Sequence, residues 1–178
     1  MRPFLTLLVC ALAVASTGCG YALAGRGNSL PTGIVTIGIP PFVNQSSTPD
    51  VDRVFTTAVT QEWQSKGKYR VQPAATGVDA TLKGVVMSVG LVPVTFNQSG
   101  QVTKYSIIAT ASIEFRELAT DKVIWANPSF QVRDDYDVGG SGAAATDVNA
   151  LFTQNQGALD RLAKAFARSV VTSIFEAF

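Results

Sequence analysis

The fold is decided by one stretch of the chain, residues 103–116, which reads TKYSIIATASIEFR. Every odd-numbered position from Tyr105 to Phe115 is apolar, whereas the even-numbered positions are mostly polar or charged. Because successive side chains of a strand point to opposite faces, this alternation predicts one long strand with a packed face and a wet face. Such a sheet must cover its apolar face with other elements.

The flanking segments predict partners for this strand. Residues 79–91 are rich in valine, and residues 123–133 contain Trp125, Phe130 and Val132. Turn signals separate the three segments, with Pro93 and residues 97–100 on one side and residues 119–122 on the other. We expect a long hairpin loop at the first connection and a short turn at the second. Consecutive strands joined in this way pair antiparallel, so a meander is expected.

Two shorter segments leave alternatives open. Residues 34–40 form a strand that Pro40 and Pro41 must end, because proline cannot donate to a ladder. The sequence does not decide whether this strand pairs parallel or antiparallel with the meander. The run 69–71 either begins a further strand or only leads into the sheet.

Two amphipathic helices are predicted. Residues 46–50 combine hydroxyl groups, a proline and an aspartate, a helix-start pattern with a hydroxyl cap, and Gly67 marks the end. Residues 134–146 are acidic and then rich in glycine and alanine, which predicts a mobile loop. A second helix follows, with one apolar stripe: Val148, Leu151, Phe152, Leu159, Leu162, Phe166, Val170 and Ile174. The expected class is α+β, a two-layer sandwich with both helices on one face of a roughly four-stranded, mostly antiparallel sheet.

The N-terminus has the pattern of a bacterial lipoprotein signal. Arg2 precedes an apolar run, residues 4–15, and small residues lead up to Cys19. The alternative, a signal anchor that spans the membrane, is disfavoured because the run is shorter than the roughly 20 residues that a span needs. We therefore expect a signal peptide over residues 1–18, acylation of Cys19, a tether over residues 19–32 and one domain over residues 33–178.

The composition and motifs of the chain argue against most classes of catalytic, metal-binding and nucleic-acid-binding site. The chain has no histidine, which excludes a Ser–His triad and an imidazole metal ligand. The glycine-rich run 140–145 lacks the following strand of a dinucleotide site, and the acidic run 134–137 lacks the later acid of a calcium loop. With a formal net charge of +1 there is no electrostatic footprint for nucleic acid. We expect no enzyme, no cofactor and no metal.

Several short pieces together resemble the LPS-assembly lipoprotein family, LptE-like. They are Cys19-Gly20-Tyr21, Phe42-Val43-Asn44, Tyr69-Arg70-Val71, Asp79-Ala80-Thr81-Leu82-Lys83-Gly84, Phe96-Asn97 with Gly100, and Asp121-Lys122-Val123-Ile124-Trp125. The resemblance implies a plug subunit inside an LptD-like outer-membrane β-barrel, which supports assembly of the barrel and passage of lipopolysaccharide to the outer leaflet. Gly20, rather than aspartate, after the acylated cysteine is consistent with outer-membrane delivery.

An anionic lipopolysaccharide would need cations held on firm elements. Strand parity selects Lys83, Lys104 and Arg116 on the meander, and Lys66, Lys68 and Arg70 lie around the end of the first helix. The plain alternative is ordinary solvated charge. Two further readings of the whole chain stay open, a periplasmic lipoprotein regulator or a secretion-channel component that binds another envelope protein.

Overall fold

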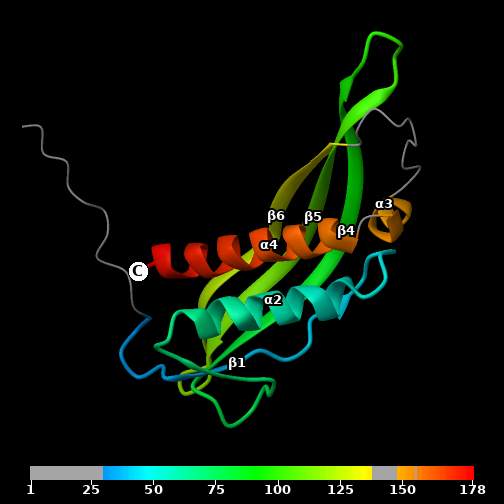
Figure 1. Cartoon of the computed structure of the whole chain (residues 1–178). Helices are drawn as coiled ribbons and strands as arrows, with labels where there is room; N and C mark the ends of the chain where they lie inside the picture. Colours follow the sequence, from blue (N-terminus) through cyan, green and yellow to red (C-terminus); the bar gives the residue numbers. More distant parts are fainter. Residues whose placement is uncertain (1–29, 138–147, 155) are drawn as a thin grey trace, which may run out of the picture.

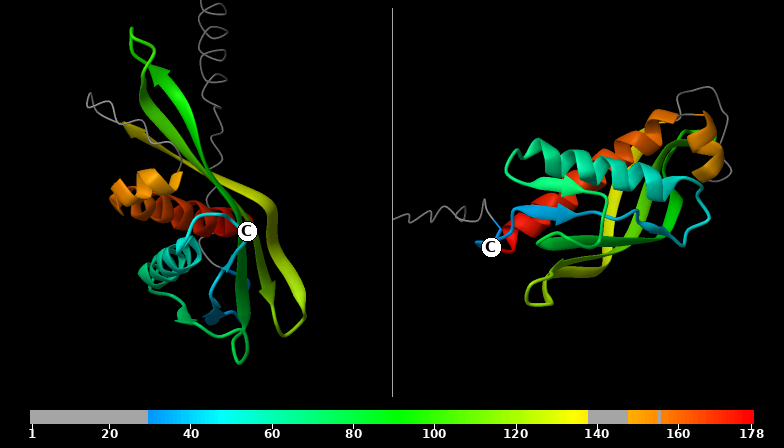
Figure 2. Two further views of the ribbon diagram at one scale, coloured as in Figure 1. Left: turned by 90° about the vertical axis from the view of Figure 1, so that its right-hand side faces the viewer. Right: turned by 90° about the horizontal axis from the view of Figure 1, so that it is seen from below.

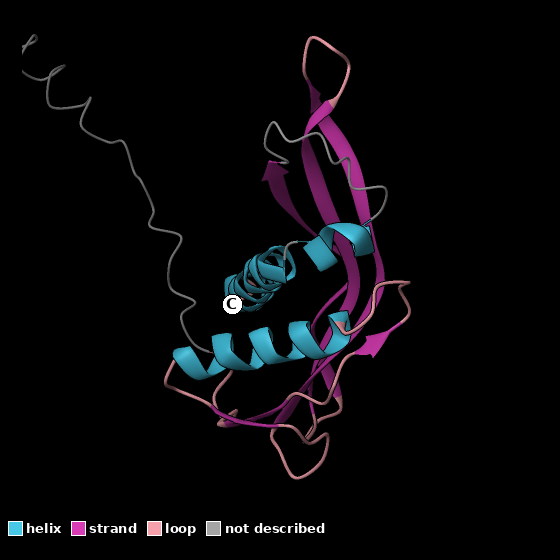
Figure 3. Ribbon diagram, turned by 45° about the vertical axis from the view of Figure 1, so that its right-hand side comes forward, coloured by secondary structure: helices cyan, strands magenta, loops and turns pink. Residues whose placement is uncertain are grey.

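The computed structural model describes residues 30–137, 148–154 and 156–178. One mixed sheet carries helices on a single side (Figures 1 and 3). Cys19, the predicted signal and the glycine- and alanine-rich run 139–145 lie outside the described residues. The elements are β1 (Thr36–Gly38), β2 (Val43–Asn44), α2 (Val51–Ser65), β3 (Arg70–Gln72), β4 (Ala80–Phe96), β5 (Val102–Glu117), β6 (Lys122–Asp137), α3 (Val148–Gln154) and α4 (Gln156–Glu176).

The predicted meander is confirmed as the antiparallel series β4, β5 and β6. On β5 the odd-numbered side chains are buried, from Tyr105 at 6% exposed to Phe115 at 0%. The even-numbered side chains form the outer face and are half-buried, with one exception. Ser106 is 1% exposed, and its Oγ donates to Asp135 Oδ1 of β6 at 2.9 Å. The alternation in the sequence therefore gives the two faces correctly.

The helix layer lies on the inner face of the sheet, as predicted (Figure 3). Phe55 of α2 and Phe166 of α4 pack with ring centroids 4.6 Å apart. Trp63 of α2 reaches the sheet and stacks on Phe115 at 5.8 Å. These contacts join both helices and β5 into one core. Among the described residues, no helix is long and apolar enough to span a membrane.

The sheet has six strands rather than four. The order is β3-β1-β4-β5-β6, and β2 also pairs with β4. β1 pairs in parallel with both β3 and β4, which answers the question that the sequence left open. The run 69–71 does begin a further strand, β3. The count was too low because strands of two or three residues are too short to show an alternating pattern.

The helix start differs from the prediction. α2 begins after Asp50, which has a φ of 59°, and no side chain caps it. Asn44 organises the preceding loop instead, because its Nδ2 donates to Thr48 O at 2.8 Å and its Oδ1 accepts from Ser46 N at 2.9 Å. Gly67, with a φ of +67°, follows the end of α2 as expected.

Three other boundaries also differ. Pro93 lies within β4, so the hairpin loop is only the short turn after Phe96. The acidic residues Asp134 to Asp137 extend β6 instead of starting a loop, because they pair with residues 104–107 of β5. The C-terminal helix is divided into α3 and α4.

The assignment of the faces predicts a ranking of stability. Replacing Phe115 by alanine should lower the free energy of unfolding by about 3 to 5 kcal/mol, because the ring is fully buried against Trp63. Replacing Ser112 on the outer face by alanine should change it by less than about 0.5 kcal/mol. Urea melts of the two variants compare the costs, and a larger cost for Ser112→Ala would contradict the assignment.

Candidate functional site

The three cations predicted on the meander all lie on the outer face, but they do not form one cluster. In the β4–β5 ladder, Lys83 lies opposite Glu114, and Arg116 lies opposite Thr81. Lys104 is twelve positions from Arg116 along β5, which corresponds to roughly 40 Å in an extended strand. One phosphate-bearing headgroup cannot contact all three.

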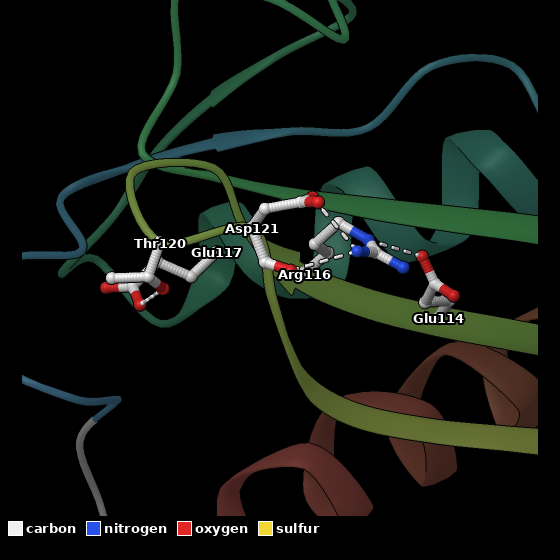
Figure 4. Close-up of polar contacts among 5 residues, drawn as sticks. All are labelled: Glu114, Arg116, Glu117, Thr120 and Asp121. Atoms are coloured by element: carbon white, nitrogen blue, oxygen red, sulfur yellow. Dashed lines mark hydrogen bonds and ion pairs between the residues drawn. The ribbon is translucent and has the colours of Figure 1, made fainter.

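Arg116 bonds to residues of β5 and of the β5–β6 turn (Figure 4). Its Nε donates to Glu114 Oε1 at 2.9 Å, and its Nη1 donates to the carbonyl oxygen and Oδ1 of Asp121 at 3.0 and 2.9 Å. These two carboxylates raise the pKa of Arg116. Asp121 has a φ of 52°, in the left-handed region, and Glu117 accepts from Thr120 in the same turn. These bonds indicate that Arg116 stabilises the β5–β6 turn.

The other two cations differ in their pairing. Lys104 Nζ lies 3.5 Å from Asp137 Oδ1. Lys83 is exposed, and no ion pair joins it to another residue in the part of the chain that the structure describes. Of the three, Lys83 therefore presents the most accessible positive charge.

The second predicted group lies at one end of the domain. Lys66, Lys68 and Arg70 are exposed where α2 ends and β3 begins. Lys66 Nζ pairs with Glu62 Oε1 at 2.8 Å. Between them and the N-terminal segment, Leu30 N donates to the Tyr69 hydroxyl at 3.1 Å. This group therefore lies close to the point where the chain leads back towards Cys19.

A single carboxylate fixes β1 against β4. Asp79 Oδ2 accepts from Val35 N at 2.9 Å and from Thr36 N and Oγ1, both at 2.7 Å. In return, Asp79 N donates to Thr36 O and Oγ1 at 3.0 and 2.9 Å. The bonds to Thr36 and Val35, together with the charge of Arg70, lower the pKa of Asp79.

Other residues of the family-like pieces also have structural roles. A Cβ on Gly84 would lie 2.7 Å from the ring of Phe42, so only glycine lets that ring pack on β4. Asn97 closes the β4–β5 turn, because its Oδ1 accepts from Ser99 N and Gln101 N, both at 2.9 Å. Gly100 completes the turn with a φ of 76°. No cluster of potential metal ligands occurs among residues 30–137, 148–154 and 156–178.

A surface that the sequence analysis missed lies at the far end of the same hairpin. We call residues 88–106 of β4 and β5, with their turn, the ribbon. It projects past the helices (Figures 1 and 2), and Val92, Val94 and Phe96 are 46%, 51% and 56% exposed. The available signal was the complete absence of charge from residue 84 to residue 103. Several large exposed apolar side chains within one short stretch of strand indicate a binding surface.

Comparison with known families identifies the chain. Residues 34–174 match the family described as LptE: Lipopolysaccharide-assembly. The chain belongs to this family. The match begins two residues before β1 and ends within α4, so it includes the sheet and most of the helix layer of this LptE-family protein. The resemblance inferred from the short sequence pieces is therefore confirmed.

Solved structures support the fold. Rare lipoprotein B from Shewanella oneidensis is 17% identical, with a TM-score of 0.50 over 78% of this chain and 92% of that one. The protein CT253 from Chlamydia trachomatis is 8% identical, with a TM-score of 0.53 over 79% of this chain and 96% of that one. Likeness at such low identity shows a shared fold only. Among curated proteins, none matches the chain significantly.

The Asp79 contacts predict a pH dependence of stability. A carboxylate whose pKa is lower in the folded state stabilises the fold above its unfolded pKa, near 3.9, and loses that effect as the pH falls through the folded pKa. Asp79→Asn should therefore be less stable than the unmodified protein at pH 7, and the difference should shrink below about pH 4. Urea melts of both proteins from pH 7 to pH 2 measure it. A difference that stays constant over this range would contradict the role of the charge.

Proposed function

We propose that this LptE-family protein is a lipid-anchored, non-catalytic subunit of the outer membrane that supports assembly of an LptD-like β-barrel partner and passage of lipopolysaccharide to the outer leaflet. The observation that carries the proposal is the family match over residues 34–174. Acylation at Cys19 would hold the protein at the membrane, and the lipoprotein signal of the sequence supports that anchor.

The geometry of the domain is consistent with insertion into a partner. Leu30, where the described chain begins, lies against Tyr69 beside β3. The turn of the ribbon lies at the opposite end of β4, a strand of 17 residues and thus roughly 55 Å long. An anchor at one end therefore leaves the other end free to enter a hydrated lumen.

The surface of the ribbon favours a protein as the binding partner. The side chains of Val92, Val94 and Phe96 are exposed in the free protein. Their burial by a partner would stabilise the complex, because it removes apolar area from water. The outer face of the sheet next to them is polar and half-buried, which suits a surface that meets both partner and water.

Isolation of the protein from outer membranes tests this function. A tagged full-length chain, extracted in mild detergent, should retain one large β-barrel protein in stoichiometric amount. Replacing Val92, Val94 and Phe96 together by threonine should reduce that recovery, because the exposed apolar contacts are lost while the strand is kept.

The alternatives give different results in the same experiment. Recovery of a cell-wall enzyme would favour a periplasmic regulator, and recovery of a secretion channel would favour a component of that channel. Either outcome, without a barrel of the LptD kind, contradicts the proposed function.

For lipopolysaccharide, Lys83 is the strongest single candidate on the outer face. Lys83→Glu should weaken lipopolysaccharide binding by the purified protein, and the effect should decrease as salt is raised, because exposed charges are screened. Arg168→Glu on α4 is the matched control, since it changes the net charge equally at another exposed position. Equal binding by both variants would show that Lys83 has no specific role.

The group at the end of α2 provides a second arm of that measurement. Reversing Lys66, Lys68 and Arg70 to glutamate tests the end of the domain near the tether. Arg116 stays unchanged in every variant, because its bonds to Glu114 and Asp121 hold the β5–β6 turn and a loss of binding would then be ambiguous.

A further inference from the structure

Among the described residues, the outer part of β4 has an edge with no paired strand, although α3 contacts β4. The first part of β4 pairs with β1 at Ala80 and Thr81, and then with β2 at Val85 and Val86. The last bond on that side runs from Gln45 N to Val86 O at 2.8 Å. Beyond it, β4 continues to Phe96 and pairs only with β5 within the part of the chain that the structure describes. From residue 88 onwards, β4 is therefore an open edge.

The two edges of the ribbon region differ in their protection. Proteins commonly guard an exposed edge with charged residues, proline or bulges, since an open ladder invites pairing with another chain. The other edge, β6, carries Arg133, Asp134, Asp135 and Asp137, and Pro128 lies further along it, at the register shift opposite Ala111 to Ile113. The open edge of β4 carries no charged residue anywhere from Ser88 to Phe96. On β4, Pro93 and the register shifts lie at the ends of residues 88–93, so only the stretch between them lacks charge, proline and bulge.

The geometry of the open edge is regular over a short stretch. Ser88 to Pro93 pair with Thr110 to Tyr105 without interruption, and register shifts occur only before Ser88 and after Pro93. Proline lacks a donor, so it suits an edge position and also ends the stretch that can bind a further strand. The available edge is therefore residues 88–92, with Val94 and Phe96 exposed beside it.

We infer that residues 88–92 of β4 bind an extended, uncharged segment of the barrel partner by strand addition. This inference rests on the proposed function and specifies how the partner is held. Main-chain hydrogen bonds along the edge would supply affinity, and contacts with alternate side chains would supply selectivity. A charged segment does not fit, because it would lie against a strand that offers no countercharge between Lys83 and Lys104.

The composition of the ribbon disfavours a lipid surface as the occupant. The turn that a membrane would meet first consists of Asn97, Gln98, Ser99, Gly100 and Gln101, all of which are exposed. An inserting loop needs aromatic or large apolar residues at its tip, whereas here the apolar residues lie along the side of the strand. That position fits a neighbour lying alongside the ribbon.

Gly90 permits a test that spares the fold. A Cβ at this position would meet nothing within 4 Å, and its φ is not in the left-handed region. Gly90→Lys places a charge on the open edge, the device that natural edges use against pairing. Gly90→Ala is the neutral control at the same site. Gln131→Lys is the control for an added charge, because Gln131 is exposed on the outer face of β6.

The experiment uses the tagged full-length chain isolated with its partner. Gly90→Lys should lower the recovery of the barrel by about tenfold. Both controls should recover as much of the barrel as the unmodified protein does. Hydrogen exchange of those amides in residues 88–92 that point away from β5 should be fast in the free protein and slow in the complex, because added main-chain bonds protect them.

Three outcomes would overturn the inference. Normal recovery of the barrel by Gly90→Lys is one, and unchanged exchange of residues 88–92 in the complex is another. If the free protein is a dimer with these amides already protected, the occupant of the edge is a second copy of this chain. Failure of the unmodified protein to retain any barrel would instead contradict the proposed function itself.

Discussion

The carboxylate of Asp79 holds the arrangement on which the rest of the structure depends. Its Oδ2 accepts three hydrogen bonds from Val35 and Thr36, and this locks β1 beside the start of β4. β1 has only three residues, so its ladder alone supplies few bonds. The added bonds to an ionised group, which are stronger than neutral ones, compensate for that shortness. The chain after β1 then has a defined starting point.

The helix layer is placed from that point. After β1 the chain brings Phe42 onto Gly84 of β4, and the ring of Phe42 also meets Phe166 of α4 edge-on at 6.4 Å. Phe42 N donates to Thr56 Oγ1 of α2 at 2.9 Å, which ties the same segment to the other helix. The residues of Phe42-Val43-Asn44 and of the Asp79–Gly84 segment thus maintain the fold.

Long elements could be predicted from the sequence, and features that depend on register could not. The alternation on β5 and the stripe on α4 are periodic over many residues, so faces and layers follow directly. The parallel pairing of β1 depends on Asp79, which bonds to Val35 and Thr36 far back in the chain. The start of α2 depends on the side chain of Asn44, which bonds to Ser46 and Thr48 in place of a hydroxyl cap. The cations show the same limit, because parity places Arg116 on the outer face but cannot show that Glu114 and Asp121 both bind it. The open edge of β4 became visible only once its neighbours were known.

We propose that the helix-covered body maintains the fold and that the ribbon binds the partner. Site-specific photocrosslinking in intact cells tests it most directly. A photoreactive residue at Val94 or Phe96 should form an adduct of the chain with a large outer-membrane barrel protein, and one at the exposed Thr57 of α2 should not. Adducts from Thr57 without any from the ribbon would contradict the account.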